Sequence, residues 1–400
     1  MIFFRLGEQL TEFYREKEEV TCIQASENND YLAAGYADGV VLIFNIATKE
    51  TICTFSLHRT AVTCLRFDSL GLKLVSGGLD TDLVVCDVVA QVGKCRLSGH
   101  SNAITDCCIM EKYKDIVISS SKDSHIKFWN IETQFCFKTL VDHRAEVWGL
   151  ALMRDDTFLV AGSKENTLRV YKISDNQSHK DNFINLDISS MLQADDDSLS
   201  PFKSTFVGTI QRSGKGRTIN LVSDLQRQVL GCSGQDDEIE LFYFCTTEES
   251  IQRLTKRLKK VSLKKDGAEI SKEISLTDEI RRITSIKTKE KVKSFDLLLS
   301  STNELRIGTT FANNLVRMYS LDIHEKHPEH KLVRSITQQG HHSECRSVCF
   351  SSDNLAIASG SGESLKLWNR SSLACLRTVE TEYILSTCFV PGKIRSIEFQ

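Results

Sequence analysis

Short apolar runs separated by turn residues recur along this chain, and residues 99–130 show the pattern most clearly. Ile104–Met110 and Ile116–Ser119 are the two apolar runs of this stretch, and Ile126–Trp129 alternates apolar and polar positions. Between the second and the third run, Lys122-Asp123 is a candidate for a tight turn. Three short strands joined by turns describe most of a small antiparallel sheet.

The same pattern recurs every 42 or 43 residues, and three sets of landmarks share this spacing. The acidic turn residues are Asp38, Asp80, Asp123 and Glu165; the residues six positions later are Phe44, Cys86, Trp129 and Tyr171; the histidines are His58, His100 and His143. A repeat of about 42 residues with Gly-His near one end and Trp-Asn near the other resembles the WD-repeat β-propeller. We therefore expect an all-β fold: a propeller of about seven four-stranded blade units, not necessarily a closed ring, with a basic helical insertion.

After the fourth unit the period breaks, and the chain divides into unlike segments. They are four regular WD blades over 20–173, a polar and acidic loop over 174–203, a degenerate blade over 204–247, the basic helical insertion over 248–288, a second degenerate blade over 289–322, a WD blade over 341–379 and the truncated start of a further blade over 380–400. The acidic run Asp195–Asp197 is interpreted as part of a disordered loop, with partner binding as the alternative. Ser275–Ile286 is expected to form a second short helix, and Tyr383–Val390 to begin another strand.

The segment from Glu248 to about Lys265 has the periodicity of a helix. Its apolar residues fall at steps of three, four and three: Ile251, Leu254, Leu258 and Val261. The cations around them are the candidate nucleic-acid or partner-binding residues: Arg253, Lys256, Arg257, Lys259, Lys260, Lys264 and Lys265. Such a cluster can contact several phosphates or serve as a nuclear address. The alternatives are a helix that docks by its apolar stripe on its own propeller or on a partner, and a merely solvated helix.

The composition is that of a globular protein without a global attraction to nucleic acid. Apolar residues make up 41% of the chain and charged residues 26%, and the net charge is −3. Any contact with nucleic acid must therefore come from a local patch. The first residues contain an apolar run of only four, and no stretch is long enough to span a bilayer, so we expect neither a signal peptide nor a membrane segment.

The 14 cysteines are interpreted as reduced thiols. Three of them recur in the register of the repeat, as expected of equivalent buried positions: Cys22, Cys64 and Cys107. Cys345 and Cys349, with His341 and His342 just before them, come closest to the spacing of a metal site. The apolar strand around Cys349 instead favours a packed thiol, and we expect neither a metal nor a cofactor.

The motifs of this chain predict no catalysis. Gly214–Arg217 lacks the spacing of a phosphate-binding loop and precedes a strand, so it is interpreted as a turn, and neither a nucleophile elbow nor His-Glu-x-x-His is present. The third repeat gathers His100, Ser119, Asp123 and Trp129. In WD-repeat propellers the equivalent residues form a hydrogen-bonded network inside a blade, and the resemblance implies such a structural network here, with Asp123 accepting from His100. We therefore expect that the protein is not an enzyme.

Several segments are similar to one particular group of WD-repeat proteins. They are residues 138–152, 276–297, 313–321 and 349–379. Together with the lysine-rich helical insertion, they resemble the tandem-propeller WD-repeat subunit of the UtpB subcomplex, which belongs to the small-subunit processome. In this resemblance, residues 1–19 replace most of the first blade, and most of the second propeller is missing after Val390.

The resemblance implies a non-catalytic scaffold in ribosome biogenesis, needed for maturation of 18S ribosomal RNA. Such a scaffold would bind other processome subunits, and pre-rRNA or snoRNA either directly or through the complex, in the nucleolus. Neither a membrane nor a small-molecule substrate is expected as a partner. The alternative is a generic protein-interaction adaptor, such as the substrate receptor of a ubiquitin ligase, although no recruitment element is evident near either end.

Overall fold

A computed structural model describes residues 2–5, 8–12, 18–175, 202–214, 216–262, 274–300, 302–312, 315–325, 328–336, 340–341, 343, 345–351, 353–372, 374–381 and 384–388. Within these residues, seven four-stranded sheets follow one another in chain order, and β1 (Ile2–Arg5) and β2 (Glu8–Glu12) form a separate two-stranded sheet. The expectation of an all-β propeller with about seven four-stranded blades is confirmed.

Each of the first three large sheets is a meander of four consecutive strands. The first sheet contains β3 (Val20–Ala25), β4 (Tyr31–Tyr36), β5 (Val40–Asn45) and β6 (Thr51–Ser56). The second contains β7 (Val62–Phe67), β8 (Lys73–Gly78), β9 (Leu83–Asp87) and β10 (Val92–Leu97). The third contains β11 (Ile104–Ile109), β12 (Ile116–Ser121), β13 (Ile126–Asn130) and β14 (Phe135–Leu140).

The next two sheets each receive their fourth strand after a long insertion. The fourth sheet contains β15 (Val147–Met153), β16 (Phe158–Ser163), β17 (Thr167–Asp175) and β18 (Phe202–Gln211). The fifth contains β19 (Asn220–Ser223), β20 (Val229–Ser233), β21 (Glu238–Phe244) and β22 (Ile280–Lys287). The helices α2 (Thr247–Ser262) and α3 (Leu276–Glu279) lie between β21 and β22 in the chain.

The last two sheets complete the described strands. The sixth contains β23 (Val292–Leu299), β24 (Glu304–Phe311), β25 (Val316–Asp322) and β26 (Lys331–Ile336). The seventh contains β27 (Cys345–Phe350), β28 (Ala356–Ser361), β29 (Ser364–Asn369) and β30 (Cys375–Glu380). By internal contacts the chain forms two compact units, one of residues 1–308 with 319–331, and the other of residues 309–318 with 332–400.

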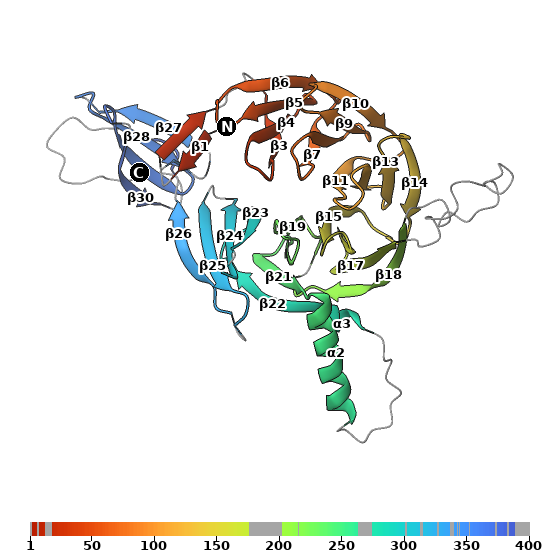
Figure 1. Ribbon diagram of the computed structural model, residues 1–400. Helices are drawn as coiled ribbons and strands as arrows, with labels where there is room; N and C mark the ends of the chain where they lie inside the picture. The colour runs from red at the N-terminus through yellow and green to blue at the C-terminus, as the bar shows by residue number, and fades with distance from the viewer. Residues whose placement is uncertain are drawn as a thin grey trace. The chain divides into compact units, whose positions relative to one another are not determined.

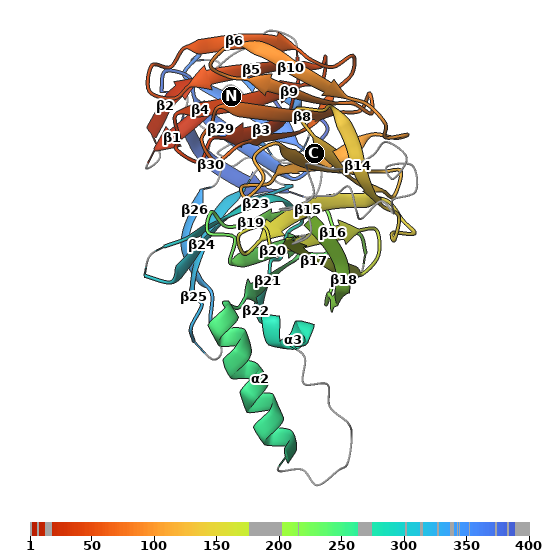
Figure 2. The ribbon, with the colours of Figure 1, turned by 45° about the vertical axis from the view of Figure 1, so that its right-hand side comes forward.

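Within the first unit, the first strand of each sheet lies beside the first strand of the next. The strands in this row are β3, β7, β11, β15, β19 and β23. Figure 1 shows β3 to β22 as sheets along an arc, with β6, β10, β14, β18 and β22 on the outer edge, and Figure 2 shows α2 extending away from the fifth sheet. Since chain direction alternates within each sheet, turns such as that between β20 and β21 lie at one end of the strands, and α2 lies at the other.

The core lies between neighbouring sheets. Every residue of β12 is buried, as expected for a middle strand covered on both faces. One cluster joins the second and the third sheet through Val85, Ile109 and Trp129, and a second cluster joins the third and the fourth sheet. Burial of these apolar faces, at roughly 25 cal/mol per Å² of apolar surface, is the main stabilising contribution.

Three strand assignments differ from those expected from the sequence. Phe202–Gln211, expected to open the degenerate blade, pairs with β17 as the outer strand of the fourth sheet. Ser275–Ile286 is helical only at Leu276–Glu279, and Ile280–Lys287 pairs with β21. The described residues 384–388 contain no strand; Ile384 is buried, and Thr387 donates a hydrogen bond to Ser347.

Candidate functional site

The insertion begins with a well-capped helix. The Glu249 N–H donates to Thr246 Oγ1 over 3.3 Å, and the Thr246 N–H donates to Glu249 Oε2 over 2.9 Å, which together form a capping box. Glu248 and Glu249 lie in the first turn, where a carboxylate stabilises the positive end of the helix dipole. The helix therefore starts at a fixed point, directly after the last residues of β21.

Two of the seven candidate cations fasten α2 to the propeller. Arg257 lies 3.0 Å from the Asp278 carboxylate and also donates to Ser275. Arg253 donates to Cys245 Sγ over 3.0 Å and to the Asp278 carbonyl oxygen over 3.4 Å. Asp278 is only 4% exposed, so its partner is a structural requirement, because a buried carboxylate is costly unless it is paired.

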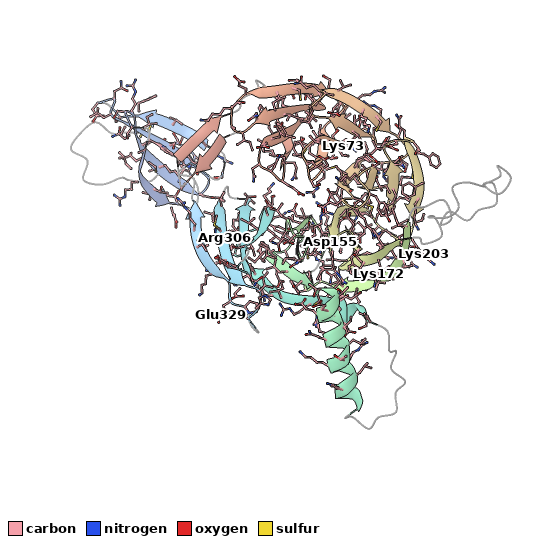
Figure 3. The ribbon with its side chains drawn as sticks, in the orientation of Figure 1. Lys73, Asp155, Lys172, Lys203, Arg306 and Glu329 are labelled. Carbon is pink, nitrogen blue, oxygen red and sulfur yellow. The ribbon has the colours of Figure 1, made fainter. Side chains whose placement is uncertain are left out.

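The helix α3, which Arg253 and Arg257 contact, is itself held to the fourth sheet. Ser275 caps α3, with its N–H and its hydroxyl both donating to Asp278 Oδ2 over 3.1 and 2.8 Å. Glu279, 3% exposed, pairs with Lys172 of β17 over 3.1 Å. Figure 3 labels Lys172 on the fourth sheet, near the base of α2. We name the contacts of Arg253, Arg257 and Lys172 with α3 the helix clamp.

The remaining cations divide by position. Lys256 and Lys259 are exposed, and their spacing of three residues places them on one side of α2, which we name the lysine face. For Lys260 the structure describes only the backbone in α2, and Lys264 and Lys265 lie outside the described residues, as does the acidic run Asp195–Asp197. Sequence reasoning missed the helix clamp, although Ser275-x-x-Asp278 is a readable capping motif.

The second candidate group lies inside the third sheet and forms a continuous chain of hydrogen bonds. The Trp129 indole N–H donates to Ser119 Oγ, and Ser119 Oγ lies 2.8 Å from His100 Nε2. Since a carboxylate only accepts, His100 Nδ1 donates to Asp123 Oδ2 over 2.8 Å, and His100 Nε2 then accepts from Ser119. Ser119 is fully buried, so each bond satisfies a group that water does not reach.

Asp123 is held in its charged form by several donors. Burial alone would raise the pKa of Asp123, but hydrogen bonds from His100 and from the amides of His125 and Ser101 hold this pKa well below its usual range. A carboxylate with this many donors orients the imidazole and closes the turn between β12 and β13.

Other sheets contain parts of the same hydrogen-bond network. In the second sheet, His58 lies 2.9 Å from both Asp80 and Ser76, but Cys86 takes the tryptophan position. In the fourth sheet, the Tyr171 hydroxyl lies 3.3 Å from His143 Nε2. In the seventh sheet, Ser359 forms hydrogen bonds with both Trp368 and His341. The imidazole of His341, which belongs to the less favoured metal alternative, thus has a hydrogen-bond partner, and His342 lies outside the described residues.

Among the described residues, no group of three or more His, Cys, Asp or Glu side chains is arranged to hold a metal ion. No helix among the same residues combines the length and the hydrophobicity needed to cross a bilayer.

Comparisons with known proteins place these features in a family. The family model described as the WDR3 first beta-propeller domain matches residues 3–173, and the model of the WD domain, G-beta repeat, matches residues 331–369. Human WD repeat-containing protein 3 is 39% identical over 194 residues, which are 46% of this chain and 21% of that protein. U3 small nucleolar RNA-associated protein 12 of Saccharomyces cerevisiae is 30% identical over 387 residues, which are 94% of this chain and 38% of that protein.

A more distant match has a related name. Pre-rRNA-processing protein IPI3 of Mycosarcoma maydis is 28% identical over 144 residues, which are 31% of this chain and 24% of that protein. The chain thus spans at most 38% of the length of these three relatives.

Proposed function

Because this chain is a WD-repeat β-propeller protein homologous to WD repeat-containing protein 3 and to U3 small nucleolar RNA-associated protein 12, we propose that it is a non-catalytic scaffold in ribosome biogenesis. The names of two relatives support this role, since one is associated with a small nucleolar RNA and the other processes pre-rRNA. In this proposal the protein acts in the nucleolus, in the small-subunit processome, during maturation of 18S ribosomal RNA. Its partners are other processome subunits and pre-rRNA or snoRNA.

The lysine face is the proposed point of contact with RNA. The observation that carries this proposal is the exposure of the cations of α2, because the side chains of Lys256 and Lys259 are exposed, whereas those of Arg253 and Arg257 are half-buried against α3. A clamped helix presents its exposed lysines at a fixed place, so less conformational entropy is lost on binding. With a net charge of −3, the chain depends on such a local patch for any attraction to phosphates.

The test is a charge reversal of the lysine face, Lys256→Glu with Lys259→Glu. Arg257 is left unchanged, because its loss would also open the helix clamp. The matched control is Lys289→Glu with Lys291→Glu, which changes the net charge equally at exposed positions between β22 and β23. We expect weaker binding to single-stranded pre-rRNA segments for the first variant, and a plot of log affinity against log salt that is less steep by about 1.4, or about 0.7 per lost phosphate contact.

Equal losses in the two variants would show a general charge effect and contradict the lysine-face assignment. The wider proposal is tested separately by affinity purification of the tagged chain. Recovery of processome proteins and pre-18S RNA is expected, together with a nucleolar signal in microscopy. Recovery of ubiquitin-ligase subunits without that signal would instead support an adaptor.

A further inference from the structure

Trp148 breaks the repeat at a position where the three preceding sheets have threonine. The threonines of β3, β7 and β11 follow the first residue of each strand, and all three donate to carbonyl oxygens: Thr21, Thr63 and Thr105. Trp148 occupies this register in β15, 43 residues after Thr105. The first three sheets thus use threonine at this position, and the fourth sheet has an indole there instead.

Cations from both neighbouring sheets lie over the indole ring. Lys122, in the turn between β12 and β13, has its Nζ atom 5.0 Å from the ring centroid. Arg217, which follows β18 and precedes β19, has its Cζ atom 4.4 Å from the same centroid. Trp148 lies near the start of β15, and the two cations lie in connections between strands. All three lie at the end of the strands opposite to α2.

The donors of this cluster lack acceptors. The indole Nε1 of Trp148 and the Nε of Arg217 are both buried, and neither has a hydrogen-bond partner among the described residues. Lys122 and Arg217 form no ion pair within the described part of the chain either. Asp236, on the turn between β20 and β21, is not within ion-pair distance of Arg217, and its Oδ2 also lacks a described partner. Buried donors without acceptors call for a physical explanation, and a bound anion is one that would satisfy these donors together.

We propose that Trp148, Arg217 and Lys122 form a binding site for a phosphate group. Phosphate oxygens can accept from the indole N–H, from the guanidinium Nε–H and from the ammonium group together, because they present acceptors in several directions. The phosphate is either free inorganic phosphate or a backbone phosphate of a nucleic-acid strand. The turn at Gly214–Arg217 thus contributes to anion binding through Arg217, without the geometry of a nucleotide-binding loop. The site is independent of the lysine face and of the proposed scaffold role.

Tryptophan fluorescence provides a direct test on the full chain. Trp129 and Trp368 each donate to a serine hydroxyl, over 2.8 and 2.7 Å, so Trp148 is the indole that a ligand would reach. Inorganic phosphate is titrated against chloride at constant ionic strength and constant pH. We expect a saturable change in emission, and at least tenfold weaker binding for Lys122→Gln with Arg217→Gln. The matched control, Lys164→Gln in the exposed turn between β16 and β17, is expected to bind phosphate as the unchanged chain does.

The absence of a saturable response, or equal affinity in the double variant and the control, would overturn the proposal. Circular dichroism and thermal melting of both variants ensure that a loss of binding is not a loss of fold. A single-stranded uridine hexanucleotide then identifies the source of the phosphate. Weaker hexanucleotide binding in the double variant assigns the site to nucleic acid, and unchanged hexanucleotide binding assigns it to free phosphate. In the Lys256→Glu and Lys259→Glu variant, phosphate binding is expected to be unaffected.

Discussion

Replacement of Ser119 by alanine tests the hydrogen-bond chain of the third sheet. Ser119 Oγ accepts from Trp129 and donates to His100, each over 2.8 Å, and the residue is fully buried. Alanine removes both contacts and leaves one donor and one acceptor without partners. Each such group costs about 1–3 kcal/mol, so we expect the third sheet to lose about 2–6 kcal/mol of stability.

Ser76→Ala in the second sheet is the matched control. Ser76 lies 2.9 Å from His58 Nε2 and is equally buried, but the position of Trp129 is taken there by Cys86. The imidazole loses its partner and the Val84 carbonyl oxygen loses a longer contact of 3.4 Å, while no indole is involved; the expected loss is about 1–3 kcal/mol. The difference between the two variants therefore measures the tryptophan–serine bond.

Native-state hydrogen exchange is the appropriate assay, because a chain of 400 residues in two compact units is not expected to unfold in one step. A loss of 2 kcal/mol corresponds to about 30-fold faster exchange of the amides of β12 and β13. Ser76→Ala should accelerate exchange of β8 and β9 by a smaller factor. Equal factors for the two variants, or less than threefold acceleration in Ser119→Ala, would refute the account of the network given above.

Two further predictions concern the helix clamp and the fourth sheet. Arg257→Ala removes the ion pair with Asp278. Since an isolated helix of 16 residues is only marginally stable, hydrogen exchange of the α2 amides should accelerate at least tenfold, while the amides of β20 and β21 keep their protection. Burial, and secondarily Arg169, lowers the pKa of His143 from 6.5 to about 4, so its stabilising contribution is present above pH 6.5 and is lost as the pH falls towards 4. As the pH falls from 6.5 to 4, the free energy of opening measured by hydrogen exchange of the β15 and β16 amides should decrease by up to about 3 kcal/mol. In His143→Gln this free energy should depend much less on pH.

The repeated part of the fold is predictable from the sequence because its signals are local. Landmarks 42 or 43 residues apart specify turn, strand and network positions in the first four sheets. Prediction failed where a strand is separated from its sheet by an insertion. The apolar alternation of β18 does not say whether the strand pairs with β17 or opens the next sheet, since strand pairing is a non-local property.

The segment after α3 shows a different ambiguity. Leu276, Ile280 and Ile283 have the spacing of a helical stripe, and strict alternation fails because Arg282, which is exposed, falls on the same side as Ile280. The β-branched residues of this run favour a strand, but its periodicity does not. Pairing with β21 along Ile280–Lys287 makes this choice in the folded protein.

The candidate site was only partly predictable, because a sequence does not tell which cations are used internally. Arg257 and Lys256 are neighbours in one basic run, yet one contacts Asp278 and the other is exposed. The acid that selects between them lies 21 residues away along the chain and is brought close by β22. The number of cations in the sequence therefore overestimates how many of them are exposed for contact with phosphates.

Departures from the repeat separate the residues needed for the fold from those free to serve function, and Trp148→Thr tests this division. Thr105, in the same register one sheet earlier, donates to the Val147 carbonyl oxygen over 2.7 Å, so threonine fits the first strand of a blade. The substitution should therefore change exchange protection of β15 and β16 by less than about threefold, corresponding to about 0.7 kcal/mol. It should also abolish phosphate binding measured by calorimetry, because both the indole donor and the surface beneath Arg217 are lost. If phosphate still bound with unchanged affinity, the indole would have no part in the site, and the buried Nε1 would remain unexplained.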